Sequence, residues 1–116
     1  MRFLSVSLCV LLMACSTRPE SLPSATVGAP DPSKVVESLR KVAVEAKLGE
    51  PLEMSVPIRA HPISSIPWIV CLRSGATELS KRRPLAVFYR GNDYVEARLS
   101  VIVDRCDSQA FTALPK

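Results

Sequence analysis

The strongest constraint on the fold of this chain is a hairpin signature in its second half. Two apolar-rich segments, Leu85–Arg90 and Tyr94–Asp104, flank the turn residues Gly91, Asn92 and Asp93. Glycine and asparagine accept the left-handed backbone conformations that tight hairpin turns need. The sequence therefore predicts two antiparallel strands joined by a three-residue loop.

Alternation along this hairpin gives it one apolar face. In the predicted register Tyr89 pairs with Val95, Val87 with Ala97 and Leu85 with Leu99, and the same face continues through Val101 and Val103. A slip by one residue would mix apolar and polar side chains on both faces, which a half-buried sheet avoids. We expect the opposite face to be largely exposed to water; it carries Ala86, Phe88, Arg90, Tyr94, Glu96, Arg98, Ser100, Ile102 and Asp104.

A helix is predicted ahead of the sheet, over residues 32–47. Asp31 is a favoured N-cap residue, and proline, here Pro32, is favoured at the first helical position. Apolar side chains then recur at helical spacing, at Val35, Leu39, Val42 and Ala46. Gly49 followed by Pro51 is a stop signal for the helix.

The other strands are shorter or interrupted. Trp68–Arg73 is a clear strand, whereas Met54–Arg59 contains Pro57 and is an edge strand at best, because proline cannot donate a backbone hydrogen bond. Residues 110–114 form a short tail that we expect to dock on the core. The sequence thus predicts an α+β fold, with one N-terminal helix packed on a three- or four-stranded antiparallel sheet.

The N-terminus has the layout of an export signal. Arg2 precedes a short apolar run that ends in Leu12-Met13-Ala14-Cys15. This ending is similar to the lipobox of bacterial lipoproteins. The resemblance implies that the signal is cleaved before Cys15, that the thiol of Cys15 receives a diacylglycerol, and that its new amine carries a further fatty-acyl chain such as palmitate. Two or more acyl chains hold a protein stably at a membrane.

Two alternatives to lipidation stay open at this point. The apolar run is well short of the ~20 residues that span a bilayer, which argues against an uncleaved transmembrane helix. Ala14-Cys15-Ser16 also fits an ordinary secretory cleavage site loosely. In enteric-type lipoproteins an Asp after the cysteine retains the protein at the inner membrane, so Ser16 favours the outer membrane, facing the periplasm.

The lipoprotein interpretation divides the chain into three parts. Residues 1–14 are the signal peptide, 15–30 a lipid-anchored disordered stalk, and 31–116 a small α+β domain. The stalk is expected to be disordered because its Ser, Pro and Ala residues bury too little surface to offset the entropy of ordering. The net charge of +4 is a mild excess, not the basic stripe of a nucleic-acid-binding protein.

Two cysteines remain once Cys9 is removed with the signal and Cys15 is acylated. In an oxidising compartment Cys71 and Cys106 are expected to form a disulfide; two separate buried thiols are the alternative. Strand alternation places both on the exposed face of the sheet, because Trp68, Val70 and Leu72 point to the core. An antiparallel pairing of Cys71 with Cys106 would put Arg73 opposite Asp104.

The sequence offers little for catalysis. His61 is the single histidine, which excludes metal sites built on several histidines, and no nucleophile elbow accompanies the serines. The carboxylates Glu50, Glu53, Glu96 and Asp104 are expected to be solvated surface groups, and the four glycines form no phosphate loop. We therefore expect no catalytic residue, no metal and no cofactor.

A basic and partly aromatic surface is the candidate for binding. Its residues are Arg73, Lys81, Arg82, Arg83, Phe88, Arg90, Tyr94 and Arg98. The arginines and lysine suit anionic lipid headgroups, lipopolysaccharide phosphates or acidic polysaccharide, and Phe88 with Tyr94 suits a partner protein. The alternatives are a merely soluble face with interleaved carboxylates, and aromatics that are half-covered by cross-strand neighbours.

The C-terminal half resembles small lipoproteins encoded in many alphaproteobacteria. The resemblance rests on Trp68–Arg73, Ala86–Tyr89 and Val103–Cys106 together with the lipobox, and it implies an envelope location and the cysteine pair but no activity. We therefore expect a non-catalytic, outer-membrane-anchored lipoprotein that binds an envelope protein or an anionic surface component. The alternatives are an accessory subunit of an envelope assembly or secretion complex and a small envelope hydrolase.

Overall fold

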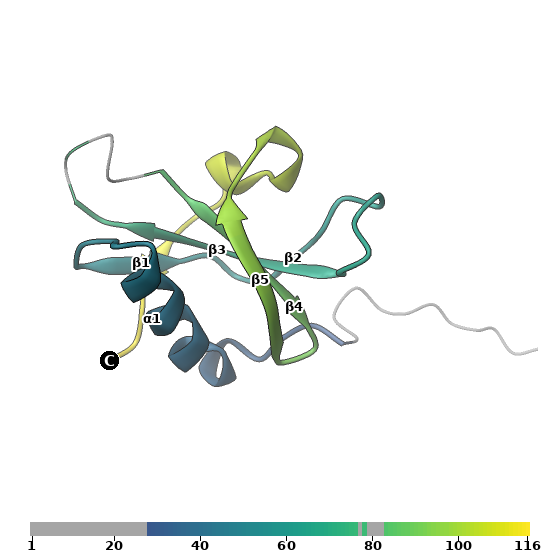
Figure 1. Cartoon of the computed structure of the whole chain (residues 1–116), viewed down its shortest axis with the longest axis horizontal. Helices are drawn as coiled ribbons and strands as arrows, with labels where there is room; N and C mark the ends of the chain where they lie inside the picture. Colours follow the sequence, from purple (N-terminus) through teal and green to yellow (C-terminus); the bar gives the residue numbers. More distant parts are fainter. Residues whose placement is uncertain (1–27, 77, 79–82) are drawn as a thin grey trace, which may run out of the picture.

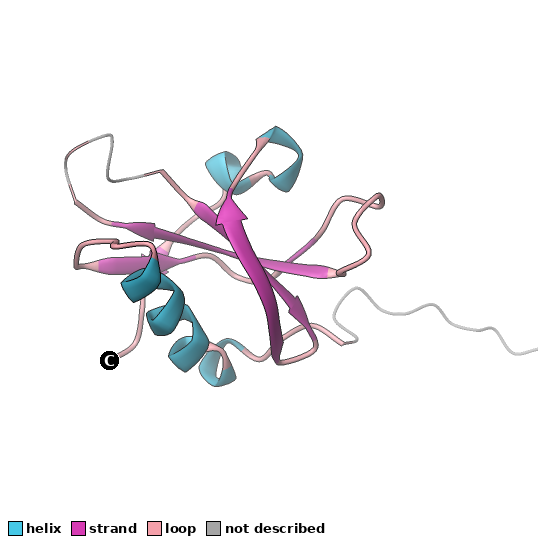
Figure 2. Cartoon of the chain, viewed as in Figure 1, coloured by secondary structure: helices cyan, strands magenta, loops and turns pink. Residues whose placement is uncertain are grey.

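A computed structural model describes residues 28–76, 78 and 83–116. One helix, α1 (Val36–Glu45), packs on one face of an antiparallel sheet, and short 3₁₀ turns lie toward its other side (Figures 1 and 2). The predicted α+β class is confirmed. The sheet, however, has six strands rather than three or four.

The sheet is built around one long central strand. Its strands run in the order β5-β4-β3-β1-β6, with β2 also paired to β3. Their bounds are β1 Leu52–Met54, β2 Ile58–Arg59, β3 Trp68–Ser74, β4 Leu85–Arg90, β5 Asp93–Leu99 and β6 Thr112–Ala113. The two additional strands come from the interruption at Pro57, which splits the predicted Met54–Arg59 strand, and from the C-terminal tail. Because β6 pairs with β1, β1 is not an edge strand.

The hairpin register is partly as predicted. Leu85 pairs with Leu99 and Val87 with Ala97, but Tyr89 pairs with Tyr94 instead of Val95. A register shift between Phe88 and Tyr89 causes this difference, since a bulge places one additional residue on one strand. β5 also ends at Leu99 and does not continue to Asp104, because the chain turns away into the 3₁₀ turns η3 (Ile102–Asp104) and η4 (Cys106–Ser108).

The N-terminal helical region begins as predicted but has a different internal structure. The Asp31 carboxylate accepts a hydrogen bond from the Ser33 backbone N–H at 2.9 Å and caps a 3₁₀ turn, η1 (Pro32–Lys34), ahead of α1. The helix ends before Ala46, and Lys47 adopts a left-handed φ of 59°. Ala46 is consequently exposed, and Ala43 takes its place on the buried face.

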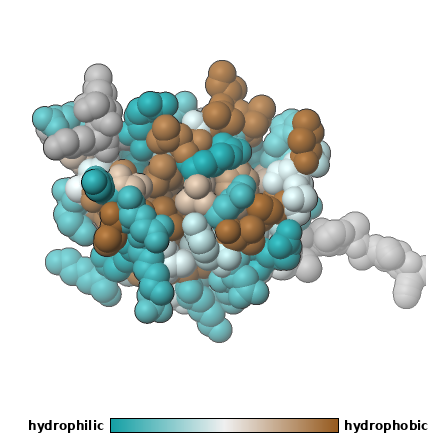
Figure 3. Space-filling view, in the orientation of Figure 1, coloured by the Kyte–Doolittle hydropathy of each residue, from teal (hydrophilic) through white to brown (hydrophobic). Residues whose placement is uncertain are grey.

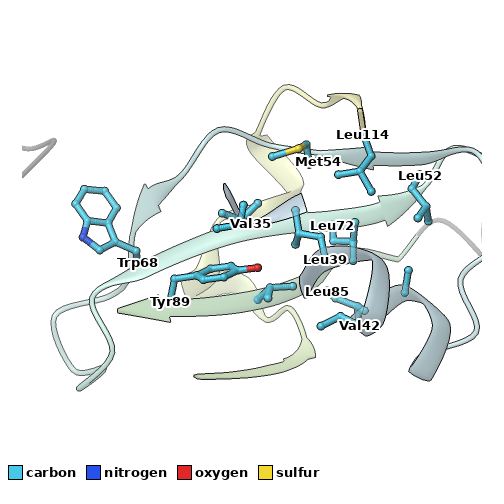
Figure 4. Packing of buried hydrophobic residues seen from close by; sticks show 13 residues of the cluster. Val35, Leu39, Val42, Leu52, Met54, Trp68, Leu72, Leu85, Tyr89 and Leu114 are labelled. Atoms are coloured by element: carbon cyan, nitrogen blue, oxygen red, sulfur yellow. The ribbon is translucent and has the colours of Figure 1, made fainter. Parts of the chain in front are cut away.

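The main core lies between α1 and the sheet (Figure 4). Tyr89 is fully buried there, and its hydroxyl is 2.6 Å from the Ser38 hydroxyl on the helix. Trp68 lies at the end of this cluster (Figure 4). The C-terminal tail docks as expected, because Leu114 is buried in the same cluster and its N–H donates to the Leu52 carbonyl.

The opposite face of the sheet was predicted to be largely exposed, and this is wrong at its centre. A second core lies there, formed by Ile66, Ile69, Cys71, Ala86, Phe88 and Cys106, with Ile58, Ala60 and Phe111 against it. Residues 102–111 fold back over this face after β5 ends. Alternation assigned Cys71 and Phe88 to the correct face but does not reveal what covers that face.

The predicted disulfide between Cys71 and Cys106 is present, with Cα atoms 5.6 Å apart, within the usual range for such bonds. The strand pairing expected around it is wrong. Cys106 lies in η4, and the strand neighbour of Cys71 is Ala86. Arg73 is therefore opposite Glu53 and not opposite Asp104.

Burial of Tyr89 predicts a loss of stability in alkali. Desolvation raises the pKa of Tyr89 to about 12, although the hydrogen bond with Ser38 opposes the rise. An unfolded tyrosine ionises near pH ~10, so the stabilisation is complete below that pH and is lost as the pH rises toward the folded pKa. We expect Tyr89→Phe to flatten the fall in unfolding free energy between about pH 10 and pH 12. Urea denaturation at these two pH values measures the fall. Tyr94→Phe should retain most of the wild-type decline, because the charge of Tyr94 is the smallest of the causes that shift the pKa of Tyr89; an unchanged decline in Tyr89→Phe would refute the assignment.

Candidate functional site

The structure places only part of the predicted basic surface. Lys81 and Arg82 lie outside the described residues. Arg83, Arg90 and Tyr94 are exposed, whereas Phe88 is buried in the second core. Arg90 donates to the Ser65 carbonyl at 3.3 Å, and Tyr94 contacts the Tyr89 ring edge-on.

Arg73 and Arg98 are both engaged within the fold. The Arg73 Nε donates to Glu53 at 2.7 Å, and its guanidinium lies 4.0 Å from the centre of the Phe111 ring. Arg98 binds both carboxylate oxygens of Asp104 at 2.7 and 3.1 Å, with its guanidinium 4.9 Å from the Phe88 ring centre. Each guanidinium is thus placed between an aromatic ring and a carboxylate, and its charge is largely matched.

A different pair of arginines flanks an open groove. The groove has a volume of about 770 Å³ and is lined by Ala29, Pro30, Asp31, Pro32, Val56, Pro57, Ile58, Arg59, Trp68 and Arg105. Its walls come from the segment before α1, from β2 and its approach, and from the turn between η3 and η4. The volume is in the range of small-molecule sites, which are mostly apolar with a few polar groups.

Arg59 and Arg105 are positioned by the fold. The Arg59 guanidinium lies 5.1 Å from the centre of the Trp68 ring, a cation–π distance. Arg105 donates to the Arg59 carbonyl at 2.6 Å and adopts a left-handed φ of 62° between the two 3₁₀ turns. Among the described contacts neither guanidinium pairs with a carboxylate. Their positive charges are therefore available to a ligand.

Asp31 is the carboxylate among the described residues of the groove lining. Hydrogen bonds from the Ser33 hydroxyl and N–H lower the pKa of Asp31, so this group is ionised at neutral pH. Its own N–H donates to the Asn92 side chain at 2.7 Å, which ties the start of the folded region to the β4–β5 turn. The described residues of the groove lining therefore carry two positive charges and one negative charge.

Sequence patterns did not single out Arg59 or Arg105. Neither arginine belongs to a basic cluster or a motif, and the groove joins residues that are far apart in sequence. One signal was available for Arg105, because it precedes Cys106 and must lie where the disulfide places that turn. No comparable signal pointed to Arg59.

A smaller hollow of about 250 Å³ contains the single histidine. The Nδ1 of His61 accepts a hydrogen bond from the Ile63 N–H at 3.1 Å. The Ser64 hydroxyl donates to the Ile66 carbonyl and accepts from the Ile66 N–H. These polar atoms are used to hold the turn. In the described part of the chain, no group of three or more His, Cys, Asp or Glu side chains is placed to hold a metal ion.

Comparisons with known proteins give no further guidance. The chain matches no protein-family model, and no curated protein or solved structure shows significant similarity to it. Among the residues that the structure describes, none of the helices has the length and apolar character needed to cross a membrane.

Asp104 should be essential for the turn that carries Arg105. Its side chain is only 2% exposed and accepts hydrogen bonds from Arg98 and from the Val101 N–H at 2.8 Å. Replacing Asp104→Ala leaves that N–H without a partner and removes the charged contact, so we expect a loss of about 2–3 kcal/mol in unfolding free energy. Urea denaturation of the wild type and the variant measures this difference in unfolding free energy. Asp107→Ala, at an exposed site in η4, should change stability by less than about 0.5 kcal/mol; equal effects would contradict the assignment.

Proposed function

We propose that this protein is a non-catalytic, lipid-anchored module of the bacterial cell envelope that binds an anionic ligand in the groove flanked by Arg59 and Arg105. The observation that carries the binding site is a pair of guanidiniums that, among the described residues, have no carboxylate partner and lie beside an open apolar wall. The Leu12–Cys15 motif supports attachment through Cys15 at the outer membrane, facing the periplasm.

The chemistry of the groove defines the class of ligand. A carboxylate or phosphate matches two guanidinium groups, which are well suited to planar and bidentate anion recognition. Val56, Pro57 and Ile58 provide an apolar wall for the body of the ligand. Asp31 disfavours a second anionic group at its end of the groove. The best-fitting ligand has one anionic head and an apolar body.

A non-catalytic role is supported by the polar groups near His61. General acid–base chemistry needs a positioned group free to exchange a proton with the substrate. The hydroxyl of Ser64, which lines the same hollow as His61, both donates to and accepts from the Ile66 backbone, so it is committed to its own loop and not to the imidazole. The small envelope hydrolase is therefore the weaker proposal.

An accessory subunit of an envelope complex is the second candidate. β5 lies at one edge of the sheet, and no described strand lies on its outer side. Such an edge can receive an extended segment of a partner through backbone hydrogen bonds. The bulge in β5 and the charges of Asp93, Glu96 and Arg98 are devices that limit indiscriminate pairing, so a partner here must be specific.

Lipidation predicts a defined N-terminus. In protein extracted from bacterial membranes, intact mass should show a chain that begins at an acylated Cys15. Cys15→Ala should abolish the acylation, because the substitution removes the thiol that carries the diacylglycerol, whereas Cys9→Ala should leave the mature mass unchanged. An unmodified chain that begins at Thr17 would instead identify an ordinary secreted protein.

The groove predicts binding of an apolar anion. Anilinonaphthalene sulfonate is a suitable probe, because it joins one negative charge to an aromatic body and fluoresces on binding. We expect Arg59→Gln and Arg105→Gln each to weaken its affinity roughly fivefold or more, the loss that corresponds to about 1 kcal/mol at a charged contact. Arg83→Gln removes an exposed arginine outside the groove and should bind as wild type does. Equal affinities in all three variants would place the binding site elsewhere.

A further inference from the structure

Three consecutive aliphatic side chains are displayed at the turn after β5. Ile102 is 89% exposed, and Val101 and Val103 are each about half exposed. A single exposed aliphatic residue is ordinary on a protein surface, but a run of three has a cost in solubility and indicates a contact surface. Figure 3 shows apolar side chains gathered on the upper rim of the molecule, in the region that holds η3 in Figure 1.

This turn is rigidly held, so the exposure is part of the fold. The Asp104 carboxylate accepts from the Val101 N–H at 2.8 Å, and the Asp104 N–H donates to the Val101 carbonyl at 2.9 Å. Arg98 anchors the same carboxylate to β5, and the disulfide at Cys106 anchors the following turn to β3. Ile102 therefore projects from a turn fixed on both sides.

A second exposed isoleucine lies close to this turn. Ile63 is 85% exposed, in a loop closed by the hydrogen bond from the Ser64 N–H to the His61 carbonyl. Ile63 and Val103 line the same hollow, whose lining also holds Phe88, Glu96 and the ion pair of Arg98 with Asp104. The two loops thus form one apolar rim, defined here as Ile63, Val101, Ile102 and Val103.

We propose that this apolar rim inserts into the lipid bilayer to which the protein is anchored. The rim is entirely aliphatic, as suits contact with acyl chains, whereas the centres of protein–protein interfaces favour Trp, Tyr and Arg. Arg105 is exposed in the same turn, where a guanidinium would meet headgroup phosphates once Ile102 is immersed.

The length of chain ahead of the domain supports a lipid occupant. This step rests on the proposed anchor at Cys15, which lies thirteen residues before Gly28. A chain of that length reaches at most about 45 Å even when fully extended. The domain is therefore held near the bilayer, and the rim meets lipid at high effective concentration.

Depth-dependent quenching tests the insertion directly. The acylated protein is reconstituted into phosphatidylethanolamine–phosphatidylglycerol vesicles whose acyl chains carry bromine, with Ile102→Trp as the reporter. Val44→Trp is the matched control, because Val44 is 76% exposed on the outer surface of α1. The native Trp68, only 4% exposed, gives the same background in both proteins. We expect bromine to quench the Ile102→Trp fluorescence and to leave Val44→Trp at the wild-type level; equal quenching of the two variants would overturn the proposal.

Flotation with vesicles on a density gradient tests membrane binding by the rim in the absence of the acyl anchor. The mature chain, residues 15–116 with Cys15→Ser, carries no acyl group and should still float with the same vesicles. Ile63→Asp combined with Ile102→Asp should reduce its partitioning roughly tenfold or more, and Val44→Asp should not; thermal unfolding verifies that the variants fold. If wild-type protein extracted from membranes carries no acyl group at Cys15 but the Cys15→Ser chain floats, the anchor is rejected and the insertion stands. If the Cys15→Ser chain does not float, or if a protein partner and not lipid protects the rim, the insertion is rejected and the anchor stands.

Discussion

The disulfide between Cys71 and Cys106 fixes the segment that follows β5, residues 101–108, against the central strand β3. Cys71 is in the central strand and Cys106 in a short turn, with a sequence separation of 35 residues. Closing a loop of that size is worth roughly 3.5–4 kcal/mol in the chain-entropy model. That is a large fraction of the ~5–10 kcal/mol typical of a domain this small. Besides this bond, residues 101–108 are tied to the rest of the fold by the contact of Asp104 with Arg98 and by the hydrogen bond from Arg105 to the Arg59 carbonyl.

One short segment therefore supplies several features of the surface. Its inward side closes the second core through Cys106, and Asp104 joins it to β5 through Arg98. Its outward side displays Ile102. Arg105, which lies between Asp104 and Cys106 in the sequence, lines the groove. The left-handed backbone of Arg105 allows two 3₁₀ turns to follow each other closely. Rigidity of the groove wall and of the apolar rim thus has the same physical origin.

Alternation predicted much of the sheet because the faces of a strand are set by a local rule. It placed Trp68, Val70 and Leu72 toward the helix and Cys71 away from it, and it found the pairs of Leu85 and Val87. The predicted strand pairing was wrong at Tyr89, because a bulge in β5 shifts the register there. The predicted length of β5 was wrong beyond Leu99, where the chain leaves the sheet. Neither departure has a signature in the apolar pattern.

The burial of Phe88, which was predicted to belong to the basic and aromatic surface, has a different reason. Alternation states which side of a strand a residue occupies, but tertiary structure decides whether another segment covers that side. Phe88 was assigned to the correct face, yet the returning C-terminal segment buries it. The groove residues could not be grouped at all, because Pro30, Val56, Trp68 and Arg105 meet only through long-range contacts.

The same long-range contacts explain why Arg59 differs from the other arginines. Arg73, Arg98 and Arg59 each lie over an aromatic ring, of Phe111, Phe88 and Trp68 respectively. Glu53 and Asp104 complete the first two arrangements with a carboxylate, and among the described contacts no acidic side chain completes the third. A guanidinium that a ring already positions loses little further freedom when it binds an anion. A ligand carboxylate or phosphate in the groove would therefore supply to Arg59 what the fold itself supplies to Arg73 and Arg98.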